Sequence, residues 1–415
     1  MEENPVPDVV PLRRNHAFQL LWIGSAVSQL GTELTRLAMP LLVLALTGSP
    51  GLAGVVAGAR TAVFLGVQLP AGIWVDRWDR RAVLLTSQGV QALNAAVLAV
   101  VVVAGEVRIW HFLVLGAVDG ACAAFGGPAR TVALRGVVPA EQLRSAYARE
   151  EARSHAARLI GPSLGGVLFG LGRALPFVVD AVTFVVAVVC SVFAKVPRHP
   201  ETGEKTARAS MWREAVEAVG WLWRQRGLRA ATAAVMAMNL LGGGILIPVI
   251  VLVGERGGGP VLTGAVFAGI GVGGLVGAVL SDRIGGLLPA GQLVIAILVV
   301  FAGSNAVMAL PVAAWWPMVP LLVTAVVTPA LNVVLSVAVS RLVPHDMLGR
   351  LDAVLTAAGM GLSPLAPVLG GFLAAALGGA GAVLVLGAGF ALTAVVAASS
   401  RELRRFTDDT PAARN

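Results

Sequence analysis

The chain has 415 residues, of which 57% are hydrophobic and 13% are charged, and its mean hydropathy is +0.82. A soluble domain carries about 25% charged residues, so the composition excludes an ordinary soluble protein and indicates a polytopic helical membrane protein. The net charge of +8 comes without a basic domain, aromatic-basic interleaving or zinc-ligand spacing, which argues against a nucleic-acid-binding protein.

Apolar runs of about twenty residues recur along the chain and predict an all-α integral membrane protein with twelve transmembrane helices in two pseudo-symmetric six-helix bundles. The expected spans are Phe18 to Leu46, Gly51 to Val75, Ala82 to Val103, Trp110 to Pro128, Ala148 to Leu171, Pro176 to Ala194, Leu228 to Val253, Thr263 to Leu280, Leu288 to Leu310, Pro317 to Val339, Ala353 to Leu377 and Ala380 to Ser399. The expected domains are an N-terminal bundle (1–194), a cytoplasmic central loop with an amphipathic helix (195–227), a C-terminal bundle (228–400) and a cytoplasmic tail (401–415).

Basic residues are distributed unevenly between the loops. With the N-terminus inside, the inside segments hold 24 Lys and Arg residues, and the outside loops hold only Arg108, Arg173 and Arg256. Positive charge marks the cytoplasmic side, so both termini are expected to be cytoplasmic. The first residues do not have the pattern of a cleaved signal peptide.

Ionisable residues inside spans are costly, and each is therefore a candidate for function. Glu33 and Arg36 lie on one face of the first span, because they are three residues apart. A carboxylate in a site of low dielectric constant can bind and release a proton near neutral pH, so Glu33 is the first candidate for proton coupling. A purely structural ion pair between Glu33 and Arg36 is the alternative.

Other charges occur in later spans of the first half. Asp119 in span four is the second candidate for proton coupling, and its alternative role is to neutralise Arg60 of span two or Arg158 of span five. For Asp180 in span six and His155 in span five we expect packing and interfacial roles. Glu150, Glu151 and Arg153 are expected to form a solvated entrance.

The stretch from Gly72 to Arg81 reads Gly-Ile-Trp-Val-Asp-Arg-Trp-Asp-Arg-Arg and follows span two. It resembles the signature of major facilitator superfamily transporters, and the matching residues are Gly72, Asp76, Arg77, Arg80 and Arg81. The resemblance implies that Asp76 meets the N-terminus of span eleven near Asp352 and latches the two halves in the outward-facing state. Arg80 and Arg81 either pair with acids or only mark the cytoplasmic side. The resemblance also implies that spans one and four line a central cavity.

Span five carries a second motif that resembles one of proton-coupled exporters in this superfamily, with Gly161, Pro162, Gly165 and Gly166 as its fixed residues. Proline kinks a helix and glycine permits close packing, so the motif predicts a hinge. Packing of small residues is the plainer interpretation, and both can hold. At an offset of 205 residues the motif returns in span eleven as Pro367, Gly370 and Gly371, which supports an internal repeat.

The second half has few charges in its spans. Asn239, Asn332, Met236 and Met360 are candidates for lining a substrate cavity, although methionine in a span also serves simple packing. The segment Met211 to Arg226 is amphipathic and is expected to lie on the inner membrane surface, with binding of a partner helix as the alternative.

The segment Pro128 to Leu143, with Phe18 to Trp22 and Gly31 to Pro40, looks most like the twelve-span drug antiporter branch that includes macrolide efflux proteins and siderophore exporters. The resemblance covers nearly the whole chain. This implies a secondary active exporter of a small amphipathic or lipophilic compound, driven by proton antiport in a bacterial inner membrane. The expected partners are the substrate, protons and membrane lipid; the protein is expected to be a monomer without cofactor or metal. A nutrient importer or uniporter and a transport-dead sensor are the alternatives. An enzyme is not expected, because no catalytic constellation surrounds His155 and no phosphate-binding loop is present.

Overall fold

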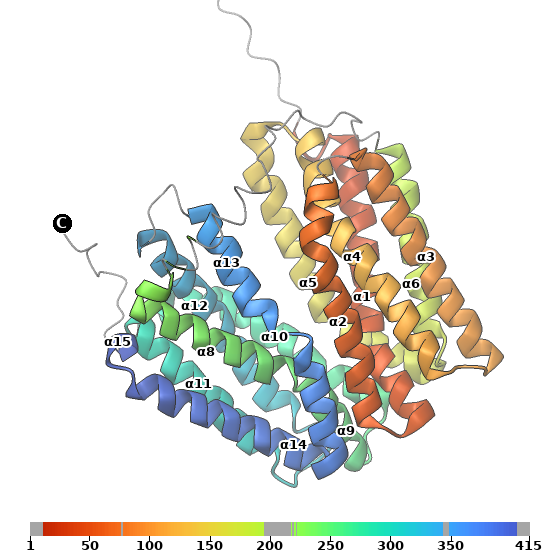
Figure 1. Ribbon diagram of the computed structural model, residues 1–415. Helices are drawn as coiled ribbons and strands as arrows, with labels where there is room; N and C mark the ends of the chain where they lie inside the picture. The colour runs from red at the N-terminus through yellow and green to blue at the C-terminus, as the bar shows by residue number, and fades with distance from the viewer. Residues whose placement is uncertain are drawn as a thin grey trace, which may run out of the picture. The chain divides into compact units, whose positions relative to one another are not determined.

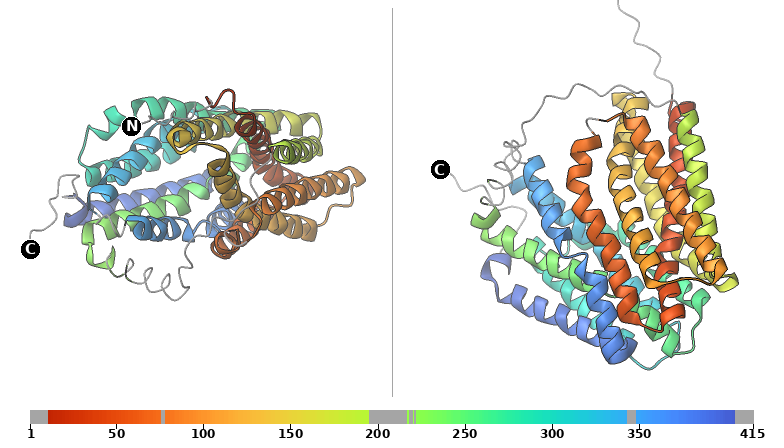
Figure 2. Two further views of the ribbon diagram at one scale, coloured as in Figure 1. Left: turned by 90° about the horizontal axis from the view of Figure 1, so that it is seen from above. Right: turned by 45° about the vertical axis from the view of Figure 1, so that its right-hand side comes forward.

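The structure is a computed structural model that describes residues 11–75, 78–194, 217, 220, 222–342 and 348–404. Asp76, Arg77 and most of the amphipathic segment Met211–Arg226 lie outside these residues. Within them every regular element is a helix (Figures 1 and 2). In chain order the elements are α1 (His16–Thr47), α2 (Pro50–Val75), α3 (Arg80–Ala104), α4 (Ile109–Val137), the 3₁₀ turn η1 (Ala140–Gln142), α5 (Leu143–Leu171), α6 (Leu175–Phe193), α8 (Arg226–Gly243), α9 (Leu246–Glu255), α10 (Pro260–Gly285), α11 (Ala290–Met308), α12 (Met318–Leu342), α13 (Leu348–Gly361), α14 (Leu365–Ser399) and α15 (Arg401–Arg404).

The helices begin and end where the sequence supplies caps and breaks. At the start of α3 the Asp79 side chain accepts a hydrogen bond of 3.0 Å from the backbone N–H of Arg81, as an N-cap does. At its end Gly105 adopts the left-handed conformation, with φ of 73°, and its N–H bonds to the carbonyl of Val102. Between such breaks a helix pairs its own backbone groups, as lipid requires.

Ten stretches of helix in the described residues are long and apolar enough to cross a membrane. Helix α5 is not among them, because polar and charged residues lower the hydropathy of its first half. Predicted span seven is divided into α8 and α9. Helix α14 is interrupted at Gly378, where φ is 71°. Predicted span eleven comprises most of α13 and the part of α14 before this break, and predicted span twelve is the part after it. The protein is therefore a multi-pass helical membrane protein, and the count of twelve spans stays a prediction.

The chain divides into two compact units, and the division cuts through three helices. The first unit contains Met1–Arg36, Val63–Gly161 and Leu171–Gly203; the second contains Leu37–Ala62, Pro162–Gly170 and Glu204–Asn415. Helices α1, α2 and α5 thus each pass from one unit into the other. In α5 one boundary falls between Gly161 and Pro162, inside the motif selected from the sequence.

In the second unit four helical segments share the pattern Pro-x-x-x-Gly and meet in two pairs. The segments are Pro50–Gly54 in α2, Pro162–Gly166 in α5, Pro260–Gly264 in α10 and Pro367–Gly371 in α14. Helix α2 meets α14 through the first and fourth segments, and α5 meets α10 through the second and third.

The contacts in each pair are reciprocal. A Cβ at Gly54 would collide with the carbonyl oxygen of Pro367, and a Cβ at Gly371 would lie 2.5 Å from the carbonyl oxygen of Pro50. In the other pair a Cβ at Gly166 would lie 2.5 Å from the carbonyl oxygen of Pro260, and one at Gly264 would lie 2.7 Å from that of Pro162. Each glycine therefore lets two helix backbones touch, where Cα–H groups can approach carbonyl oxygens.

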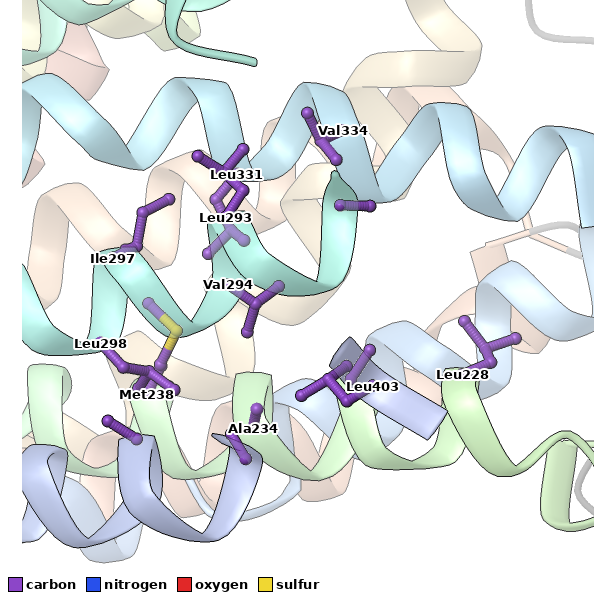
Figure 3. Packing of buried hydrophobic residues seen from close by; sticks show 14 of the residues in the cluster. Leu228, Ala234, Met238, Leu293, Val294, Ile297, Leu298, Leu331, Val334 and Leu403 are labelled. Atoms are coloured by element: carbon purple, nitrogen blue, oxygen red, sulfur yellow. The ribbon is translucent and has the colours of Figure 1, made fainter. Parts of the chain in front are cut away.

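A buried apolar cluster fills the inside of the second unit (Figure 3). Helices α8, α11 and α14 lie alongside one another here (Figure 1), and α12 packs against α11. The labelled members in Figure 3 include Met238 of α8, Ile297 of α11 and Leu331 of α12. The short helix α15 adds Leu403, which is completely buried. The start of the predicted tail is thus part of the packed core.

We expect the substitution Leu403→Ala to lower the free energy of unfolding by about 2–5 kcal/mol, because it leaves a cavity in a closed cluster. Leu392→Ala in α14 is the matched control, since Leu392 is 66% exposed. Thermal unfolding of the purified protein in detergent measures both. Equal stability of the two variants would contradict the packing of α15.

Candidate functional site

The two charged residues of α1 form an ion pair with unequal exposure. Nη1 of Arg36 lies 3.3 Å from Oε2 of Glu33. The Glu33 side chain is 10% exposed and the Arg36 side chain is 66% exposed. The carboxylate is therefore enclosed while its partner extends outward.

Helix α5 encloses Glu33 from one side. A Cβ on Gly161 would collide with Cβ of Glu33 and would lie 3.2 Å from its carbonyl carbon. Two hydrogen bonds join α1 and α5 nearer their N-terminal ends. The Ser154 hydroxyl donates to Oε1 of Gln29 at 3.1 Å, and the Trp22 indole N–H donates to the carbonyl of Arg149 at 3.4 Å. The contacts advance together along both helices, so α1 and α5 run parallel.

Helix α6 covers the other face of α1. A Cβ at Gly31 would collide with the side chains of Thr183 and Asp180, and a Cβ at Gly24 would lie 2.8 Å from Cβ of Cys190. Asp180 is buried at this contact, with 6% of the residue exposed. Its place against Gly31 agrees with the packing role expected for it.

Asp119 lies at the contact between α3 and α4. Its Oδ1 accepts a hydrogen bond of 3.3 Å from the amide of Gln91. Next to this pair the Asn94 amide donates to the carbonyl of Leu115 at 3.0 Å. On the same helix Gln88 accepts from the hydroxyl of Ser191 in α6 at 3.0 Å.

These α3 residues form a polar ladder that the sequence analysis missed. The signal was available, because Ser87, Gln88, Gln91 and Asn94 follow one another at helical spacing inside an apolar run. Polar residues at such positions typically tie transmembrane helices together.

The remaining charges of the first half are dispersed. Arg60 is half-buried and belongs to the second unit, while Arg158 is exposed on α5 in the first. His155 is half-exposed and lies 3.1 Å from Glu151, one turn away on the same helix. The expectation of a solvated entrance is wrong for Arg153. Its side chain is only 4% exposed and pairs with Glu150, because α5 is already packed at this level.

The stretch between α2 and α3 is described only in part. Gly72 lies in α2, and a Cβ there would meet no described atom within 4 Å. Arg81 donates from Nη2 to the carbonyl of Val192 at 2.9 Å, which holds the start of α3 against the end of α6. Trp74 and Trp78 of this stretch stack on each other at a centroid distance of 5.6 Å, and they stack with Phe125 of α4 at 5.9 and 6.1 Å. The role of Asp76 and Arg77 as a latch stays a prediction.

The two glycine-proline motifs lie at helix contacts. In α5, Gly161 faces α1 and Gly166 faces α10, with Pro162 and the buried Gly165 between them. In α14, Gly371 faces α2, and a Cβ at Gly370 would collide with the carbonyl oxygen of Gly244, next to α8. Pro367 offers its carbonyl to Gly54. Each motif therefore joins one helix to two neighbours.

The candidates of the second half lie on α8, α12 and α13. Asn239 of α8 donates from Nδ2 to the carbonyl of Gly359 in α13 at 3.0 Å, which ties these two helices together. Met236 and Met360 are half-buried on the same two helices, and Asn332 is exposed on α12. A substrate-lining role for them stays a prediction.

Two neighbouring residues that the sequence analysis did not select, Glu255 and Arg256, connect helix ends in the second unit. Both carboxylate oxygens of Glu255 accept from the backbone N–H of Gly379, at 3.0 and 3.2 Å. This N–H follows the break of α14 at Gly378, so Glu255 caps the second part of that helix.

Arg256 acts on the opposite end of a helix. Its Nη2 donates to the carbonyls of Met308 at 3.1 Å and Leu310 at 2.6 Å, where α11 ends. Burial holds the pKa of Arg256 below its usual value, and the neighbouring Glu255 offsets part of this shift. A cation at the C-terminal end of a helix is favoured by the helix dipole. The pair therefore binds α9 to α11 and α14.

We expect Glu255→Ala to lower the free energy of unfolding by about 1.5–3 kcal/mol, because the N–H of Gly379 loses a charged acceptor. Glu255→Gln keeps an acceptor without the charge and should recover part of the loss. Glu106→Ala in an exposed loop is the control, and thermal unfolding in detergent is the measurement. An alanine variant at 255 as stable as the wild type would contradict the capping role.

Comparison with known proteins places this fold in a family. The family model described as Major Facilitator Superfamily matches residues 21–363. Macrolide efflux protein A of Streptococcus pyogenes is 25% identical over 218 residues, which are 51% of this chain and 53% of that protein. That match thus spans about half the length of this relative. The enterobactin exporter EntS of Salmonella paratyphi A is 25% identical over 426 aligned residues and 96% of each chain is covered.

Solved structures show the same fold. A bacterial homologue of the iron transporter ferroportin in the inward-facing state has a TM-score of 0.68, 18% sequence identity, and coverage of 94% of this chain and 98% of that one. A bacterial homologue of the lysosomal transporter Spinster in the inward-facing and occupied conformation has a TM-score of 0.72, 12% identity, and coverage of 93% and 96%. The family model covers most of a chain of membrane-spanning helices, and this chain belongs to the major facilitator superfamily of transporters and is not an enzyme.

Proposed function

We propose that the protein is a proton-driven exporter of a small amphipathic or lipophilic compound in a bacterial inner membrane. The observation that carries the proposal is the enclosed carboxylate of Glu33 in the first span, 10% exposed beside a largely exposed arginine. A transporter that exchanges protons for substrate needs such a group, because the bound proton must be shielded from free loss to water. Two relatives, a macrolide efflux protein and an enterobactin exporter, support the direction of transport.

In this mechanism the chain has twelve spans in two six-helix bundles, with both termini in the cytoplasm. A proton from outside neutralises Glu33, substrate leaves, and the two bundles then change their orientation. Asp76 latches the outward-facing state against the start of α13 near Asp352. The glycine-proline segments serve as the contacts about which the helices move.

The test begins with a substrate screen. Expression in a bacterium that lacks its own drug pumps, against a panel of toxic compounds that includes a macrolide, should raise resistance to at least one compound. That compound is then offered to proteoliposomes with an acidic lumen. A proton antiporter should accumulate it inside, and a protonophore should abolish the accumulation. Entry that stops at the outside concentration, whatever the gradient, would favour a uniporter. Uptake into cells would favour an importer, and binding without movement a sensor.

A further inference from the structure

Glu33 and Gly161 meet where two helices pass from one compact unit to the other. In α1 the boundary between the units falls after Arg36, three residues beyond Glu33. In α5 it falls directly after Gly161. The next residue, Pro162, has no backbone N–H, so the hydrogen-bond ladder of α5 is interrupted at this level. Glu33 therefore lies against the place where α5 can bend most easily.

The contact at Gly161 leaves no room for a side chain. The nearest atoms to a Cβ at this position would all belong to Glu33, namely its Cβ, its carbonyl carbon and, at 3.4 Å, its Cα. Glycine thus brings the backbone of α5 directly onto the residue that carries the carboxylate. Any group larger than hydrogen at position 161 must push the two helices apart and admit water beside Glu33.

We propose that Gly161 is a positioning residue for Glu33: its missing side chain sets how closely α5 covers the carboxylate, and so sets the pH at which Glu33 takes up a proton. The proposal rests on the proton-coupling role given to Glu33 above. It adds that the motif of α5 acts on the proton site through Gly161, while Gly166, one and a half turns later, serves the contact with α10.

Other charged groups on the packed helices bear on this titration. Arg36 on α1 forms the ion pair with Glu33. Helix α5 carries Arg158 three residues before Gly161, and α6 places Asp180 against Gly31 on the other face of α1. None of the variants below changes these three groups. A shift in the pH at which Glu33 is labelled therefore reports the packing between α1 and α5.

The experiment labels protonated Glu33 with dicyclohexylcarbodiimide, which reacts with carboxylic acids in apolar surroundings. The full-length protein is purified in detergent, labelled over a range of pH values, and the modified peptide is quantified by mass spectrometry. Glu33→Gln identifies the site by losing the label. In Gly161→Ala the added methyl admits water and favours the charged form, so the pH of half-maximal labelling should fall by about one unit.

Two further variants make the result specific. Gly166→Ala, on the same helix and in the same motif, disturbs the contact with α10 and should leave the labelling midpoint unchanged. Ser154→Ala removes the hydrogen bond to Gln29 without adding volume, and should move the midpoint in the same direction by a smaller amount. This variant decides the question if Gly161→Ala does not fold.

The outcomes separate the two proposals. A wild-type midpoint in both Gly161→Ala and Ser154→Ala, or an equal shift in Gly166→Ala, overturns the positioning role. A shift confined to the α1–α5 contact supports it. Gradient-driven transport by Glu33→Gln is measured independently. Full transport by that variant would remove Glu33 from proton coupling even if its titration depends on Gly161.

Discussion

Leucine in place of Gly54 or Gly264 should lower the free energy of unfolding by about 3 kcal/mol or more, because the new side chain meets helix backbone and not a movable side chain. At Gly54 the obstacle is the carbonyl of Pro367, and at Gly264 it is the carbonyl of Pro162. The paired helices, α2 with α14 and α5 with α10, cannot move apart without losing the contact between them. Thermal unfolding of the purified protein in detergent measures the effect.

Each of these helices supplies its own matched control. Gly66 in α2 and Gly274 in α10 have no described atom within 4 Å of a Cβ, so a side chain added there begins in open space. Leucine also favours helix over glycine by about 1 kcal/mol, and the control variants should be as stable as the wild type or more so. If Gly54→Leu and Gly66→Leu unfold at the same temperature, the contact between α2 and α14 does not stabilise the second unit.

The paired Pro-x-x-x-Gly segments show which helix contacts a sequence motif can predict and which it cannot. Pro162 and Pro367 were recognised with their glycines, because one resembles an exporter motif and the other repeats it at a fixed offset. The matching segments at Pro50 and Pro260 were overlooked. Pro50 and Pro260 are the first residues of α2 and α10, where proline is common, and only the packed structure shows that all four segments meet in pairs.

The candidate proton site was predicted in part. The spacing of Glu33 and Arg36 was sufficient to place them on one helix face, and their ion pair is present. Gly161 was predicted only to take part in a hinge or in helix packing. Its contact with Glu33 depends on the rotation of α5 against α1, which periodicity alone does not determine. The same limit explains Glu255, whose partner, Gly379, lies more than a hundred residues away in sequence.

The hydrogen bond of Asp119 bears on the choice between the two candidate carboxylates. Sequence analysis weighed Asp119 against Arg60 and Arg158 as neutralising partners. The structure gives Asp119 an amide partner from the neighbouring helix, Gln91. A carboxylate that serves a helix contact keeps most of its role when it is replaced by an amide of equal shape. Replacement of each carboxylate by its amide therefore distinguishes a helix-contact role of Asp119 from a proton-coupling role of Glu33.

We expect Glu33→Gln to abolish gradient-driven accumulation in proteoliposomes while exchange of labelled for unlabelled substrate continues. A gradient of one pH unit supplies about 1.4 kcal/mol per proton, which supports about tenfold accumulation in a one-for-one exchange. Glutamine fills the same space beside Gly161 but does not take up a proton in this pH range. The variant should therefore bring substrate inside only to the concentration outside.

Two variants test the alternatives for the same site. Asp119→Asn should keep tenfold accumulation, because an amide can still meet Gln91. Arg36→Gln leaves a carboxylate that still binds a proton, so accumulation should persist with a changed pH profile. A structural ion pair predicts instead that Arg36→Gln and Glu33→Gln lose stability and transport together. Accumulation lost in Asp119→Asn but retained in Glu33→Gln would move proton coupling from α1 to the contact between α3 and α4.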